Sequence, residues 1–165
     1  MSERFGLKTT TLQELPNEVL LELITAVLEK GSAFRFQAKG GSMTPFIKDG
    51  DVITLESIQG KKIWCGDVVA VISPTPEKLR VHRVVKISKG SYIIKGDNAR
   101  GIDGTFEKAQ ILGRVIKVER GMRTIQLGSR AERALIGFLS GRNLLPRALA
   151  GLWPIVRRIS QRWEA

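Results

Sequence analysis

The 165-residue sequence is poor in the residue types that support several common kinds of functional site. It contains one cysteine, Cys65, and one histidine, His82. A single cysteine excludes a disulfide within the chain, and the two residues together are too few for a Cys/His zinc cluster. A mechanism that needs an imidazole must therefore use His82, and we expect neither a metal ion nor a cofactor.

Long hydrophobic runs are also missing. The first 18 residues are polar and lack the apolar stretch of a secretory signal peptide. The best candidate for a membrane span, residues 134–156, is interrupted by Arg142, Arg147 and two prolines, whereas a spanning helix needs about 20 apolar residues. We expect a cytoplasmic protein without a transmembrane helix.

Acidic residues are scarce in the last part of the chain. Residues 120–165 contain nine arginines, no lysine and two glutamates, a net charge of +7, whereas residues 1–119 carry only +4. The total of +11 suggests an anionic partner, and its distribution assigns that partner to the tail. The β region has few aromatic residues for stacking on bases, so nucleic acid is not the favoured partner.

The apolar residues that are present follow two different periods. Residues 13–30 have the spacing of an amphipathic helix, with Pro16 and Asn17 at its start and Gly31 after its end. Seven short runs rich in valine and isoleucine follow, separated by turn residues, at 34–38, 51–56, 67–73, 81–87, 92–96, 111–119 and 124–127. This pattern predicts a mainly β fold, a twisted antiparallel sheet or partly closed barrel.

Helical spacing returns after Gly128. The sequence therefore predicts three parts: an N-terminal segment with a helix (1–33), a β-rich core (34–127) and an arginine-rich helical tail (128–165). The tail is predicted either to pack on the core or to lie on an anionic membrane surface, with Trp153 and Trp163 at the interface. Liposome flotation with and without residues 129–165 distinguishes the two interpretations.

Three short motifs carry residues suited to chemistry. Gly40–Pro45 reads Gly-Gly-Ser-Met-Thr-Pro, where the glycines let the backbone pass close to a substrate. His82 lies within an apolar strand pattern, and residues 95–98 read Lys-Gly-Asp-Asn, ahead of Asp103. Each motif alone is more often a flexible loop, a structural histidine or a common turn.

In this order, the motifs resemble the signal peptidase I group of serine peptidases, of the S24/S26 type. The matching pattern is G-S-M-x-P-x-I-x-x-G-D at 41–51, G-D-V-V at 66–69, H-R-V-V at 82–85, K-G-D-N at 95–98 and G-R-V at 113–115. The histidine in H-R-V is similar to the archaeal and endoplasmic-reticulum branch, whereas the usual bacterial branch has a lysine there and works as a Ser-Lys dyad.

The resemblance implies a serine endopeptidase with the fold of signal peptidases, which would cleave a peptide, a leader segment or a preprotein through an acyl-enzyme. It implies that Ser42 is the nucleophile and His82 the general base. Asp103 matches the acid that orients the histidine in this branch, and Asp97 is the second candidate for that role.

The resemblance also implies how the serine is surrounded. The backbone at Ser42 and Gly41 would supply oxyanion donors, and Met43 and Pro45 match positions that shape the site. The sequence departs from the family at Gly40, where a serine that offers a second oxyanion donor is common. It also has an amphipathic helix where the family usually carries an N-terminal membrane anchor.

Two alternatives to this function stay open. A self-cleaving repressor-like peptidase would use Lys86 or Lys95 as the base, but 33 residues before the β region are too few for a helix-turn-helix domain. A catalytically degenerate peptidase fold would serve as a binding module, with the tail on nucleic acid. The pH dependence of activity separates histidine from lysine, and an acyl probe on Ser42 argues against the binding module.

Overall fold

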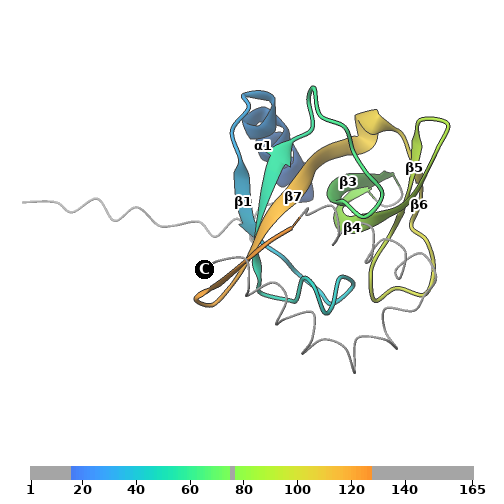
Figure 1. Ribbon diagram of the computed structural model, residues 1–165. Coiled ribbons are helices and arrows are strands. Elements are labelled where there is room, and N and C mark those ends of the chain that lie inside the picture. Colours follow the sequence, from blue (N-terminus) through green and yellow to red (C-terminus); the bar gives the residue numbers. More distant parts are fainter. Residues whose placement is uncertain (1–15, 75–76, 128–165) are drawn as a thin grey trace, which may run out of the picture.

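A computed structural model describes residues 16–74 and 77–127 of the chain. One helix, α1 (Asn17–Glu29), precedes eight strands (Figure 1). The strands are β1 (Phe34–Gln37), β2 (Val52–Ser57), β3 (Val68–Pro74), β4 (Glu77–Ser88), β5 (Ser91–Lys95), β6 (Gly104–Phe106), β7 (Ile111–Arg120) and β8 (Arg123–Gln126). A 3-10 turn, η2 (Lys108–Gln110), leads into β7.

All the strands belong to one antiparallel sheet with the order β1-β2-β7-β3-β4-β5-β6, and β8 pairs with the end of β7. The seventh strand therefore lies between the second and the third. Val52–Ser57 pairs with one edge of β7, and Val69–Val71 pairs with the other. The sheet consists of a β1-β2 half and a β3-β6 half that β7 joins.

The sheet curls instead of lying flat (Figure 1). Register shifts interrupt three strand pairs, between Thr54 and Leu55, between Ala70 and Val71, and between Val84 and Lys86. An extra residue on one strand bends it and increases its twist. Three such irregularities along neighbouring strands therefore account for the half-barrel shape.

Helix α1 packs against the sheet through one apolar stripe. Leu21, Ile24 and Leu28 are buried and lie three and four residues apart, which places them on one face of the helix. Ile24 and Leu28 belong to the same core cluster as Ile53 on β2 and Val118 on β7. This packing fixes the β1-β2 half against the central strand.

A second buried cluster fills the other part of the sheet. It contains Val69, Val84, Ile94 and Phe106, which come from β3, β4, β5 and β6. The clusters on the two halves explain why the short strands are stable, since two-stranded hairpins without an apolar face are marginal in water.

The structure confirms the predicted mainly β fold with a helix near the N-terminus. It also places a short strand, β6, that the sequence did not predict, and extends β4 back to Glu77. The predicted C-terminal helices, including the tail 128–165, lie outside the described residues. In the part of the chain that the structure describes, no helix is long and apolar enough to cross a membrane.

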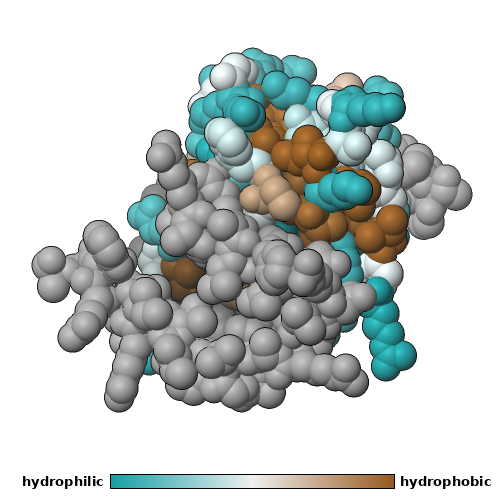
Figure 2. Space-filling model, turned by 45° about the vertical axis from the view of Figure 1, so that its right-hand side comes forward, coloured by the Kyte–Doolittle hydropathy of each residue, from teal (hydrophilic) through white to brown (hydrophobic). Residues whose placement is uncertain are grey.

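The visible surface of the described residues is mixed. Figure 2 shows one face on which a cluster of apolar residues, coloured brown, lies among hydrophilic side chains. Large apolar side chains that are exposed include Trp64, Ile102 and Met122.

Candidate active site

Ser42 lies in the connection between β1 and β2. Gly40 precedes it with a φ of +87°, in the left-handed region that favours glycine, and its N–H donates to Asp49 Oδ1 at 2.7 Å. Met43 and Ile47 after the serine are buried in the core. The buried side chains after Ser42 thus anchor the turn in the core, whereas Ser42 itself is exposed at the surface.

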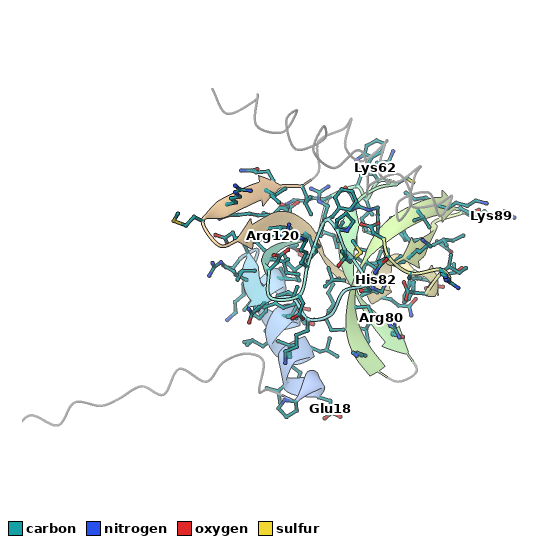
Figure 3. All side chains as sticks on the ribbon, turned by 90° about the horizontal axis from the view of Figure 1, so that it is seen from below. Glu18, Lys62, Arg80, His82, Lys89 and Arg120 are labelled. Carbon is teal, nitrogen blue, oxygen red and sulfur yellow. The ribbon has the colours of Figure 1, made fainter. Side chains whose placement is uncertain are left out.

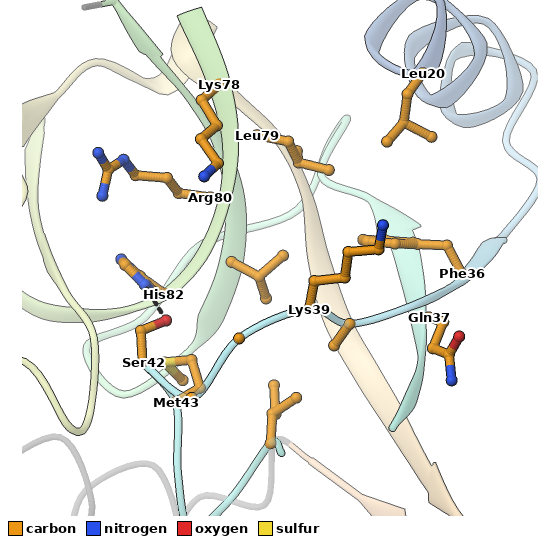
Figure 4. A pocket seen from close by; sticks show the side chains of 15 residues that line it. Leu20, Phe36, Gln37, Lys39, Ser42, Met43, Lys78, Leu79, Arg80 and His82 are labelled. Atoms are coloured by element: carbon orange, nitrogen blue, oxygen red, sulfur yellow. Dashed lines mark hydrogen bonds between the residues drawn. The ribbon is translucent and has the colours of Figure 1, made fainter. Parts of the chain in front are cut away.

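His82 lies on β4 and is 5 % exposed. Its Nε2 lies 2.7 Å from Ser42 Oγ (Figure 4). Its Nδ1 lies 2.6 Å from Asp103 Oδ2. In the tautomer with the proton on Nδ1, the ring donates to Asp103 and accepts from the Ser42 hydroxyl. These contacts form one continuous chain of hydrogen bonds from carboxylate to hydroxyl.

Asp103 comes directly before β6, where its N–H donates to Ile94 O at 2.8 Å. Its second oxygen, Oδ1, accepts from Arg80 Nη1 at 3.3 Å. Arg80 and His82 are two residues apart on β4, so their side chains leave the same face of the strand. Figure 3 shows them side by side on that strand. The Asp103 carboxylate therefore contacts two side chains on β4, those of Arg80 and His82.

Asp97, the other candidate acid, is bound to a different partner. It is fully buried and accepts two bonds of 2.8 Å from Arg83, one from Nε and one from Nη2. Arg83 is 1 % exposed and also donates to Gly66 O at 2.7 Å. The structure thus brings Asp103 to the His82 ring and places Asp97 in a buried ion pair.

The loop that contains Asp97 also supports the serine. Asn98 N–H donates to Ser42 O at 2.8 Å, and Asn98 Nδ2 donates to Gly41 O at 3.3 Å. A Cβ at Gly96 would lie 2.8 Å from Ser42 O and 3.2 Å from His82 Nε2. The loop approaches the Ser42–His82 pair so closely that only glycine fits at 96.

The backbone before and at the serine has donors to offer. Within the described residues, the N–H groups of Gly41 and Ser42 have no protein acceptor, whereas that of Gly40 is used by Asp49. Two such donors are what an oxyanion requires. Met43 is buried below this turn and Pro45 is half-buried, after a cis Thr44–Pro45 bond.

Both lysines considered as an alternative base lie near or on these strands. Lys86 is exposed on β4, and Lys95 at the end of β5 is 2 % exposed, with Nζ 3.4 Å from Gly96 O. Burial lowers the pKa of Lys95 below its ordinary value, although Asp97 and Asp103 oppose that shift.

A cleft of about 460 Å³ opens beside the Ser42–His82 pair (Figure 4). Segment 36–43 lines one wall and residues 78–82 of β4 line the other. Its apolar lining includes Leu20, Phe36 and Leu79, and its basic side chains are Lys39, Lys78 and Arg80. The hydroxyl of Ser42 therefore lies where a molecule in the cleft would meet it.

Several of these residues were not expected from the sequence. Arg80 and Arg83 bind the two aspartates, Asn98 holds the serine turn, and Gly96 leaves room for its close approach. Residue 80 lies just before the predicted run 81–87. Alternation continued back to it would place it on the face of His82, but nothing in the sequence pairs it with Asp103. In the described residues, no group of three or more His, Cys, Asp or Glu side chains could hold a metal ion.

Comparison with known proteins supports the resemblance at the level of the S24/S26 superfamily. No curated protein matches the chain. The family model described as Peptidase S24-like matches residues 3–116, which includes Ser42, His82 and Asp103. With more than half of its length matched, the chain belongs to the Peptidase S24-like family.

Proposed function

We propose that the protein is a serine endopeptidase of signal-peptidase type, with Ser42 as the nucleophile, His82 as the general base and Asp103 as the orienting acid. The observation that supports it best is the continuous contact from Asp103 through His82 to Ser42, at 2.6 and 2.7 Å. Nucleophile, base and orienter within hydrogen-bonding reach are the signature of nucleophilic catalysis.

In the first step, His82 Nε2 accepts the proton as Ser42 Oγ attacks the substrate carbonyl carbon. The carbonyl electron pair moves onto oxygen, and the N–H groups of Gly41 and Ser42, which have no acceptor among the described residues, would donate to it. Asp103 stabilises the imidazolium that forms. When the tetrahedral intermediate collapses, the C–N bond breaks and the amine leaves with the proton from His82.

The second step hydrolyses the acyl-enzyme. A water molecule gives its proton to His82 as its oxygen attacks the ester carbon. The bond to Ser42 Oγ then breaks, and His82 returns the proton to the serine. In each catalytic cycle the same imidazole thus accepts a proton twice and donates a proton twice.

The strand edges around the cleft suit an extended peptide. Among the described strands, β1 pairs only with β2, and β4 pairs with β3 at residues 77–83 but with β5 only from Arg83 onward. The edges of β1 and of the first half of β4 therefore remain for main-chain hydrogen bonds to a bound segment. An endopeptidase needs such binding to hold an internal bond against its nucleophile.

The choice of histidine over lysine as base is part of the proposal. His82 contacts Ser42 Oγ, whereas Lys95 Nζ contacts Gly96 O. A histidine base predicts an activity limb near pH 6–7, and a lysine base predicts a limb well above pH 8. The pH profile of kcat/KM therefore decides between the two.

The direct test compares Ser42→Ala with the wild-type protein on a randomised decapeptide library, with cleavage products identified by mass spectrometry. We expect cleavage and fluorophosphonate labelling by the wild type and neither by the variant. Ser32→Ala, in an exposed position after α1, is the matched control and should behave as the wild type. Cleavage by Ser42→Ala would contradict the proposal, and a wild type that neither labels nor cleaves would favour the binding module.

A further inference from the structure

We propose that Arg80 is a positioning residue of the site: it holds the Asp103 carboxylate against His82 Nδ1 and so keeps the imidazole in the tautomer that can accept the serine proton. The inference rests on the proposed function and adds to it a residue that acts through Asp103. Its starting observation is that Asp103 contacts two side chains from the same strand.

The Asp103 carboxylate divides its two oxygens between these side chains. Oδ2 lies 2.6 Å from His82 Nδ1, and Oδ1 accepts from Arg80 Nη1 at 3.3 Å. A carboxylate that is held by one oxygen alone can turn about its Cβ–Cγ bond, because torsions of this kind have broad energy wells. The bond to Arg80 therefore fixes which oxygen of Asp103 faces the ring.

Asp103 itself comes from a loop, whereas both of its partners come from a strand. The residue before it, Ile102, is 60 % exposed. Arg80 is paired with Val71 in the β3-β4 ladder, two residues before His82, and Figure 4 shows Arg80 and His82 extending from the same wall of the cleft. A residue on a paired strand thus positions a carboxylate whose loop is less constrained.

The pair between Arg80 and Asp103 is better shielded from water than an ordinary surface ion pair. The side chain of Asp103 is 12 % exposed and that of Arg80 is 36 % exposed, so their attraction exceeds that of two fully solvated groups. Within the described residues, Arg80 Nε is buried without a hydrogen-bond acceptor. An unpaired buried N–H is unfavourable, so stability alone does not explain where this guanidinium lies.

Binding the substrate directly is the alternative role for Arg80, because it also lines the cleft. Lys78 provides the comparison. It lies two residues before Arg80 on the same face of β4, lines the same cleft and carries the same charge. The ion pair with Asp103 belongs to Arg80 alone of the two. A contribution of charge to the cleft would be shared with Lys78, whereas positioning of Asp103 would be specific to Arg80.

The first experiment reads the tautomer of His82 by proton–nitrogen NMR of the isotope-labelled protein, without substrate, in alkaline buffer. Because the sequence contains one histidine, the ring signals are unambiguous. We expect the Nδ1–H tautomer in the wild type and in Lys78→Gln, and a mixture of both tautomers in Arg80→Gln. Arg80→Lys keeps the charge but not the planar fork, and should show less of the second tautomer. A single Nδ1–H tautomer in both Arg80 variants would overturn the inference.

The second experiment measures kcat and KM on a peptide that the wild type cleaves. Arg80→Gln should lower kcat about 10–100-fold and change KM little, because misplaced groups slow the chemical step. Arg80→Lys should recover part of kcat. Lys89→Gln removes the same charge in the exposed β4-β5 turn and should match the wild type. A rise in KM with kcat unchanged would make Arg80 a substrate-binding residue and overturn the inference.

The two experiments separate this inference from the proposed function. If the wild type cleaves no peptide, the peptidase assignment fails, and the tautomer of His82 alone decides whether Arg80 orients the ring. If the wild type cleaves peptides and Arg80→Gln keeps both its tautomer and its kcat, the peptidase assignment stands and the role of Arg80 is refuted.

Discussion

Two neighbouring residues on β4, His82 and Arg83, use opposite faces of one strand for different ends. His82 contacts Ser42 and Asp103 beside an open cleft, whereas Arg83 is buried and contacts Asp97 and Gly66 O. Both carboxylates come from the stretch after β5. The difference teaches that one strand can carry the pair proposed as catalytic, His82 with Ser42, on one face and a buried ion pair, Arg83 with Asp97, on the other.

The largest expected effect follows from removing the imidazole of His82. We expect His82→Ala to lower kcat by about 10³–10⁴-fold, because the serine loses its base. Its midpoint in urea should change little compared with that of Asp97→Ala. Imidazole added to the buffer should restore part of the activity of His82→Ala. Activity close to wild type would assign the base to another group, with Lys95 the first to examine.

Removing Asp97 from its ion pair with Arg83 should produce the opposite pattern, a large loss of stability. Asp97→Ala leaves the Arg83 guanidinium buried without its carboxylate, which costs about 3–5 kcal/mol of unfolding free energy. Urea denaturation measures this loss. Asp103→Ala is the matched control: Asp103 is partly accessible, so we expect a smaller loss of stability with a large loss of activity. If Asp97→Ala lost mainly activity and Asp103→Ala lost mainly stability, the roles assigned to the two aspartates would be wrong.

The close approach of the loop at Gly96 to Ser42 and His82 can be tested by adding a methyl group at position 96. A Cβ there would meet Ser42 O at 2.8 Å and His82 Nε2 at 3.2 Å, so Gly96→Ala must displace the serine or the ring. Small misplacements of reacting groups cost about 10²-fold in rate. Gly101→Ala adds the same methyl group where nothing lies within 4 Å, and its kcat should match the wild type.

The smallest expected effect on stability comes from the ion pair between Asp51 and Arg120, and it depends on pH. Burial raises the pKa of Asp51, but the hydrogen bonds from Arg120 and the Lys48 N–H outweigh it, so the pKa lies below its ordinary value. The folded state therefore binds fewer protons than the unfolded state. Asp51 contributes stability above about pH 4 that is lost as the pH falls through its folded pKa.

The measurement is urea denaturation of the wild type and Asp51→Asn between pH 7 and pH 2. The two free energies of unfolding should differ at neutral pH and converge in acid. A difference that stays constant over this range would show that the carboxylate charge of Asp51 does not act through Arg120.

Much of the fold could be predicted from the sequence because its signals are local. The runs 34–38 and 111–119 coincide closely with β1 and β7, since alternating or continuous apolar residues encode burial directly. Strand β6 could not be found because Gly104–Phe106 has only three residues. The insertion of β7 between β2 and β3 is a long-range pairing that no local pattern records.

The candidate site shows the same limit. The motifs around Ser42, His82 and Asp103 were visible in the sequence, and the structure brings these three side chains together. Which of Asp97 and Asp103 contacts the ring depends on how the stretch after β5 folds, and six residues of spacing do not decide it. The contact of Arg80 with Asp103 likewise depends on tertiary structure.

The position of β7 has a consequence for the growing chain on the ribosome. Ser42 belongs to the β1-β2 half of the sheet and His82 to the β3-β6 half, and the strand that joins the halves is the seventh of the eight strands in residues 16–74 and 77–127. A nascent chain of about 110 residues carries all three polar groups of the site without the central strand that aligns them. Pairing across distant segments is also slow to form. We therefore expect the contacts among Ser42, His82 and Asp103 to form only after β7 has docked, so that the order of synthesis itself delays assembly of the site.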